Sequence, residues 1–82
     1  MLVIFKMLAN ANRVSILLAM RNSNAALSVN DICTITKLPQ PKVSDHLRLL
    51  KIYKIVEAKQ ESTNMLYKIK DEVVANLIQN FQ

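Results

Sequence analysis

The stretch Gln40–Lys51, with the sequence QPKVSDHLRLLK, decides the fold. Val43, Leu47 and Leu50 recur at helical spacing and form one apolar stripe. Side chains that can hydrogen-bond to base edges lie off this stripe, at or near its N-terminal end: Gln40, Lys42, Ser44, Asp45 and Arg48. A second short helix is expected over Ser28–Thr36, with Lys37–Pro39 as the turn between them. This is the helix-turn-helix pattern, so we predict that Gln40–Lys51 enters the major groove of DNA.

After Lys51 the period of the apolar residues changes from the 3.6 residues of a helix to the 2 residues of a strand. Residues 55–60 and 65–69 alternate between apolar and polar, with the polar turn Glu61–Asn64 between them. This pattern predicts a two-stranded β-hairpin, in which Asn64 is the expected left-handed residue. A lone hairpin is not stable, so it is expected to pack on the helices.

Three further helices are predicted, over residues 2–8, 13–21 and 72–81. Asn10 and Asp71 are candidate N-caps, and Ser28 with Asp31 resembles a capping box. Ile32 and Ile35 are expected to give the Ser28–Thr36 helix its core contacts. The predicted fold class is mainly α with a β-hairpin wing. It is a winged helix-turn-helix in one domain over 1–82, with the helix-turn-helix at about 28–51 and the wing at about 55–69.

Half of the residues, 51%, are hydrophobic, which is more than one small core needs. Surplus apolar surface usually marks a partner surface, and the simplest partner here is a second copy in a symmetric dimer. The dimer is expected to form through the two terminal helices, at Val3, Ile4, Phe5, Met7, Leu8, Val74, Leu77, Ile78 and Phe81. Two recognition helices about 34 Å apart would then match an inverted-repeat operator.

The net charge of +5 favours an anionic partner, and nucleic acid is the commonest one. One cysteine excludes an internal disulfide, and the lack of glycine leaves the turns to Asn, Asp, Ser or Pro. An enzyme is not expected, because no nucleophile–base pair, carboxylate pair or phosphate loop can be found. No apolar run is long enough for a bilayer and no signal-peptide pattern occurs, so the expected location is cytoplasmic, without membrane contact.

Three stretches resemble the ArsR/SmtB family of bacterial repressors: KMLANANRVSILLAM, LSVNDICTITKLPQPKVSDHLRLLK and IVEAKQESTNMLYKI. The resemblance covers nearly the whole chain, and LPQPKVSDHLRLL is its most specific part. It implies a homodimeric repressor whose helix from Gln40 contacts operator DNA and whose wing reaches the backbone or minor groove. The expected contacts with double-stranded DNA are Gln40, Pro41, Lys42, Ser44, Asp45, His46 and Arg48 in the helix, and Lys59, Ser62, Thr63, Asn64 and Lys68 on or beside the wing.

Many members of that family sense metals. The family's Cys-x-Cys positions correspond here to Ser28 and Asn30, and the last helix has no histidine. Ser and Asn are poor ligands for soft metals, so we predict a member without metal sensing, without a cofactor and without an identifiable small-molecule ligand. Two alternatives stay open: a winged-helix interaction module without specific DNA binding, and a thiol- or metal-responsive repressor that uses Cys33.

Asp45 is an acid on the face expected to meet phosphates. It could accept a hydrogen bond from the amine of a cytosine, or neutralise Arg48 or Lys42 nearby, and the second role is favoured.

Overall fold

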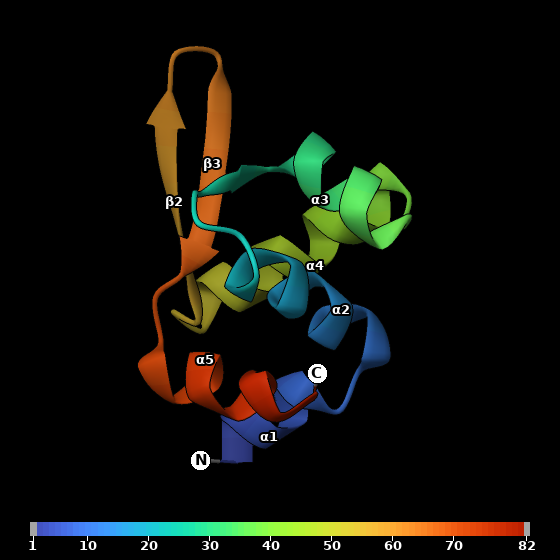
Figure 1. Ribbon diagram of the computed structural model, residues 1–82, viewed down its shortest axis with the longest axis vertical. Coiled ribbons are helices and arrows are strands. Elements are labelled where there is room, and N and C mark those ends of the chain that lie inside the picture. Colours follow the sequence, from blue (N-terminus) through green and yellow to red (C-terminus); the bar gives the residue numbers. More distant parts are fainter. Residues whose placement is uncertain (1, 82) are drawn as a thin grey trace.

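The computed structural model describes the backbone of residues 2–81 and the side chains of residues 4–80. Helices and a small sheet alternate in one winged helix-turn-helix arrangement, as predicted, with the hairpin projecting from the body and α1 and α5 at the opposite end (Figure 1). The elements follow the order α1 (Leu2–Leu8), α2 (Ala11–Arg21), β1 (Leu27–Ser28), α3 (Val29–Thr36), α4 (Gln40–Ile52), β2 (Val56–Glu61), β3 (Asn64–Ile69), α5 (Glu72–Ile78) and the 3-10 helix η1 (Gln79–Phe81).

The sheet has three strands in the order β1-β3-β2, all antiparallel. Leu27 pairs with Tyr67, and Ser28 pairs with Leu66, so β1 extends the hairpin on the β3 side. The prediction of a sheet made of the hairpin alone was therefore incomplete. A strand of two residues shows no alternation of apolar and polar residues, so the sequence pattern cannot reveal it.

The hairpin turn differs from the prediction. Ser62 takes the left-handed conformation, with φ of 57°, while Asn64 pairs with Glu61 as the first residue of β3. Lys37 and Lys54 are also left-handed, each with φ of 62°. The expectation that Asn, Asp, Ser or Pro would make every turn was therefore wrong at these two lysines. A residue with a Cβ atom pays roughly 1–2 kcal/mol for this conformation.

The predicted helix caps are confirmed. The side chain of Asn10 accepts a hydrogen bond from the amide of Arg13, and Asp71 accepts from the amides of Val73 and Val74. Ser28 and Asp31 form the predicted capping box, with both N···O distances at 3.1 Å. These caps satisfy amides that a first helical turn leaves without partners, so they determine where α2, α3 and α5 begin.

The core lies between the helices and the inner face of the sheet. The predicted stripe of α4 is confirmed, because Val43, Leu47 and Leu50 are fully buried. They share one core with residues from the other elements: Ile16, Leu17, Ile32, Val56, Val74 and Ile78. Ile35 was expected in this core but is 53% exposed. It lies three residues beyond Ile32, and α3 ends at Thr36 with only one turn packed inward.

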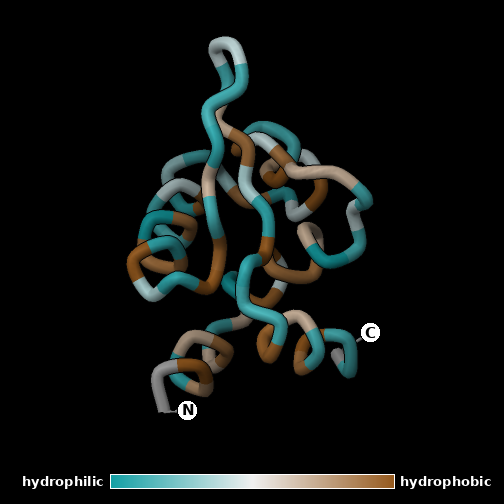
Figure 2. Tube along the Cα trace, turned by 90° about the vertical axis from the view of Figure 1, so that its left-hand side faces the viewer, coloured by the Kyte–Doolittle hydropathy of each residue, from teal (hydrophilic) through white to brown (hydrophobic). Residues whose placement is uncertain are grey.

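The outer arms of the hairpin are hydrophilic and its tip is of intermediate hydropathy, whereas the hydrophobic segments lie in the rest of the molecule (Figure 2). None of the helices in residues 2–81 has the length and hydrophobicity that a bilayer span requires.

Candidate nucleic-acid interface

The predicted polar face of α4 is exposed. Because Val43, Leu47 and Leu50 anchor the opposite side of the helix in the core, the remaining positions face outward. The exposed residues are Gln40, Pro41, Lys42, Ser44, Asp45 and Arg48. His46 is half-buried at the edge of this face. The turn Lys37–Pro39 leads directly into α4, and Pro41 lies in its first turn, where no helical amide bond is lost.

The start of α4 and the tip of the hairpin lie together. Gln40, Thr63 and Asn64 line one hollow of about 140 Å³, to which α3 contributes its N-terminal turn. The other lining residues are Ser28, Val29, Asn30 and Met65. The structure thus brings residues of the two predicted DNA-contacting segments to one hollow, together with Asn30, which the sequence analysis considered only as a Cys-x-Cys position. An exposed polar residue in the first turn of a helix-turn-helix was the available signal.

Asp45 and Arg48 form an ion pair one helical turn apart. The distance from Asp45 Oδ1 to Arg48 Nη2 is 3.9 Å, and the two side chains are 77% and 75% exposed. Such an exposed pair contributes at most about 1 kcal/mol and is weakened by salt. Of the roles expected for Asp45, the contact with Arg48 is therefore present in the chain without DNA.

His46 lies close to two cationic side chains. Burial of the ring lowers its pKa from the ordinary value of 6.5, and the charges of Arg13 and Lys42 lower it further, while Asp45 raises it. The ring is therefore neutral near pH 7, with one nitrogen as a donor and the other as an acceptor. Arg13, in the first turn of α2, is a neighbour of this face that the sequence analysis did not single out.

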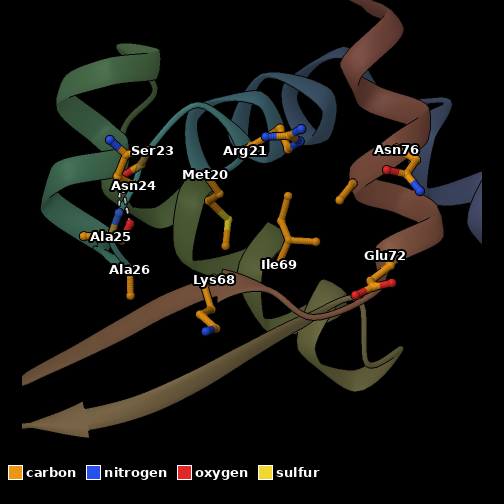
Figure 3. A pocket seen from close by; sticks show the side chains of 11 residues that line it. Met20, Arg21, Ser23, Asn24, Ala25, Ala26, Lys68, Ile69, Glu72 and Asn76 are labelled. Carbon is orange, nitrogen blue, oxygen red and sulfur yellow. Dashed lines mark hydrogen bonds between the residues drawn. The ribbon is translucent and has the colours of Figure 1, made fainter.

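The predicted lysines of the wing lie on the face of the hairpin that is turned away from the core. In the hairpin register, Lys59 is opposite Leu66 and Lys68 is opposite Glu57, on the other face from Val56, Ala58 and Tyr67. Lys68 also lies near the base of the hairpin. There it lines a hollow of about 570 Å³ with Met20, Arg21, Glu72 and Asn76, among others (Figure 3). Ser62 and Thr63 form the exposed tip.

The residues predicted for dimerisation divide into two groups. Met7, Val74 and Ile78 are buried in the core of the chain itself, so they are not available at its surface. Phe5 is 56% exposed, and Ile4, Leu8 and Leu77 are half-buried. Phe5, Leu8 and Leu77 line an apolar hollow of about 410 Å³ together with Ala9 and Asn80. The side chains of Val3 and Phe81 lie outside the described residues.

Cys33 is half-buried on α3 and packs against the core as a free thiol. Within the described part of the chain, no three or more His, Cys, Asp or Glu side chains gather where they could hold a metal ion.

The comparison with known protein families gives a direct result. The model of the bacterial regulatory proteins of the arsR family matches residues 10–58, which is more than half of the chain. The chain belongs to the ArsR family. The match extends from the cap of α2 into β2 and includes the whole of α3 and α4.

Relatives and solved structures agree with this assignment to the ArsR family. The chain is 32% identical over 75 residues to the HTH-type transcriptional regulator KmtR of Mycobacterium tuberculosis, covering 92% of this chain and 56% of KmtR. It therefore spans just over half the length of that relative. The crystal structure of the AntR antimony-specific transcriptional repressor superposes with a TM-score of 0.89 at 30% identity, covering 98% of this chain and 71% of that one.

A third similar protein is a homodimeric winged helix-turn-helix DNA-binding domain from Mycobacterium bovis, solved by NMR. Its TM-score is 0.80 at 34% identity, covering 96% of this chain and 71% of that one. The ArsR family consists of transcriptional regulators, not enzymes. The predicted family and the predicted absence of enzymatic function are thereby confirmed.

Proposed function

We propose that this ArsR-family protein is a transcriptional repressor that binds an inverted-repeat operator as a homodimer, with residues 1–82 acting as one domain. The polar face of α4, exposed beside the hairpin tip, carries this conclusion. In the proposed mode α4 is the recognition helix and lies in the major groove, while the wing contacts the DNA backbone or minor groove.

Affinity and specificity have different sources in this mechanism. Lysine and arginine side chains neutralise phosphates and supply affinity that does not depend on sequence. Lys42, Lys59 and Lys68 are exposed and suited to this role, as are the polar groups at the hairpin tip, Ser62, Thr63 and Asn64. Gln40, Ser44 and Arg48 discriminate between bases, and one good bidentate pair is worth about 1–3 kcal/mol. A dimer bound at a promoter blocks access of the polymerase.

The apolar surface of α1 and α5 supports the homodimer. Phe5 is exposed next to the apolar hollow that Leu8 and Leu77 line, and both helices lie at the end of the molecule opposite the wing (Figure 1). A twofold axis through this end would pair each helix with its own copy and leave both wings free. The homodimeric state of the similar M. bovis domain supports the same assembly.

The proposed repressor acts without a metal or other cofactor, in the cytoplasm, where its operator is found. The described residues offer no cluster of three or more ligating side chains, and Cys33 alone cannot hold a metal ion. Zinc at micromolar concentration is therefore expected to change operator affinity less than about threefold, which is below roughly 1 kcal/mol. Release of the operator by zinc would refute this part of the proposal.

The test is a selection of random duplex DNA on the purified protein at about 150 mM salt, followed by sequencing. The proposal predicts enrichment of an inverted repeat whose half-sites are about one helical turn apart. A control selection uses a variant that carries Gln40→Ala and Ser44→Ala, both exposed positions at which folding is expected to be unaffected. This variant should enrich a degenerate motif. Weak, salt-sensitive binding by the wild type without enrichment would favour an interaction module instead.

A further inference from the structure

Asn30 is an exposed polar residue beside the proposed DNA contacts that the mechanism above does not use. It lies in the first turn of α3 and lines the hollow of about 140 Å³ together with Gln40 on α4 and with Thr63 and Asn64 on the wing. All four residues are exposed. A ligand that contacts both α4 and the tip of the wing can therefore reach the side chain of Asn30 as well.

The hollow is lined by neutral groups that can donate hydrogen bonds. Three of its side chains end in carboxamides, and those of Ser28 and Thr63 end in hydroxyls. None of its seven lining residues carries a charge. Asp31, the acid that follows Asn30, does not line the hollow, and its Oδ2 accepts from the amide of Ser28 at 3.1 Å. The hollow therefore suits a ligand that presents oxygen acceptors.

The carboxamide of Asn30 has no hydrogen-bond partner within residues 4–80. Asn30 takes part in a hydrogen bond there through its backbone, since its carbonyl accepts from Oγ1 of Thr34 at 3.0 Å. The side chain can therefore turn toward a ligand without breaking a bond to the described part of the chain.

We propose that Asn30 donates a hydrogen bond from its side-chain amide to a phosphate oxygen of the DNA backbone. The inference rests on the proposed function, because the phosphate belongs to the DNA that α4 and the wing are proposed to contact. A DNA strand that runs from the groove occupied by α4 to the wing would pass this hollow. Asparagine is a common donor to phosphates, and such contacts fix the position of a protein on the duplex without reading its sequence. Asn30 thereby adds α3 to the DNA interface.

A solvated Asn30 without a role in binding predicts different behaviour. Its replacement would then leave the affinity for DNA unchanged. A neutral donor to a phosphate contributes affinity but not salt dependence, because condensed counterions are released by cationic side chains. Loss of the contact should therefore lower log K by the same amount at every salt concentration.

The first test compares Asn30→Asp with Asn24→Asp on one duplex. Asn24 is exposed in the loop between α2 and β1 and lines the hollow at the base of the hairpin, so its replacement adds the same charge elsewhere (Figure 3). At about 50 mM salt, Asn30→Asp should bind at least about tenfold more weakly than Asn24→Asp, because its carboxylate meets the phosphate at contact distance. The difference should narrow at about 200 mM salt. Folding should be retained, because Asn30 is exposed and an acid is favourable in the first turn of a helix. Equal affinities of the two variants would overturn the inference.

The second test removes the hydrogen bond without adding a charge. Asn30→Ala should bind about two- to tenfold more weakly than the wild type for each bound chain, as expected for one neutral hydrogen bond. The slope of log K against log salt should stay that of the wild type. Undiminished affinity of Asn30→Ala would overturn the inference but not the proposed function, provided that the wild type selects an operator. A wild type that shows both effects of Asn30 yet selects no sequence would contradict only the operator.

Discussion

Arg48 combines a largely exposed side chain with a weak ion-pair partner. Its ion pair with Asp45 spans 3.9 Å between exposed side chains, so little free energy is lost when the guanidinium turns to a base. Arg48→Ala should therefore reduce affinity for the selected operator by about tenfold or more, within the 1–3 kcal/mol of a base contact. The free energy of unfolding should change by less than about 0.5 kcal/mol.

The measurement is a fluorescence-anisotropy titration with operator and with unrelated duplex. Lys51→Ala serves as the control, since Lys51 is exposed in the last turn of the same helix, away from the N-terminal polar face. It should weaken binding to both duplexes alike. Undiminished specificity in Arg48→Ala would contradict the assignment of this residue.

His46 connects stability to pH. Burial, Arg13 and Lys42 lower its pKa below 6.5 in the folded chain, whereas the unfolded chain keeps the ordinary value. The unfolded state therefore binds the proton first as the pH falls. This difference in pKa contributes to the free energy of unfolding. The contribution is fully present above about pH 6.5 and is lost as the pH falls from that value to the lower pKa of the folded chain.

Thermal unfolding between about pH 5 and 8 tests this effect at His46. The wild type should lose more stability toward pH 5 than His46→Gln, which cannot titrate, and the two curves should run parallel above pH 7. Identical pH profiles would show that His46 has the same pKa in both states.

Among the structural elements, α3 ends at a C-cap residue, Lys37, that does not favour its own backbone conformation. Lys37 has φ of 62° and its amide donates to the carbonyl of Cys33, so the helix closes with a left-handed residue that carries a Cβ atom. Glycine accepts this conformation without the steric cost. Lys37→Gly should raise the free energy of unfolding by about 0.5–1 kcal/mol.

Chemical denaturation measures this gain. Lys70→Gly removes the same charge from another exposed lysine, one that is not among the left-handed residues. The Lys70→Gly variant should not raise the free energy of unfolding, because glycine at this position only adds conformational freedom to the unfolded chain. A similar gain in both variants would mean that charge repulsion, and not backbone conformation, is relieved.

The same elements show how far the sequence could be interpreted. The stripe Val43, Leu47 and Leu50 and the capping box at Ser28 are local patterns, so the helix-turn-helix could be predicted with its boundaries. The two residues of β1 and the left-handed Lys37 leave no local signal, because pairing partners and loop geometry come from tertiary packing. The charge of Arg13 on α2 lowers the pKa of His46 on α4, and spacing within one helix does not report such an influence between helices.

For the whole molecule, the question is which apolar residues a second copy covers. The sequence analysis assigned both Met7 and Phe5 to the dimer interface. Met7 is buried within the chain, whereas Phe5, two residues earlier, is exposed. Burial of a phenylalanine is worth about 1.5–3 kcal/mol, and a symmetric dimer contains each contact twice. Phe5→Glu should therefore raise the dimer dissociation constant about a hundredfold or more.

Sedimentation equilibrium measures this constant. Ile35→Glu is the matched control, because Ile35 is similarly exposed but lies on α3, far along the chain from the terminal helices. It should leave the dimer intact. Dissociation by Ile35→Glu, or an unaffected dimer in Phe5→Glu, would move the interface elsewhere.

Ser28 belongs to two elements at once, as the last residue of β1 and as the N-cap of α3. Its backbone pairs with Leu66 in the wing, while its side chain holds the first turn of α3. No residue separates β1, which pairs with the wing, from α3. A tilt of the wing is therefore expected to move α3 with it. A signal that releases the proposed complex with DNA is therefore expected to move α3 together with the wing.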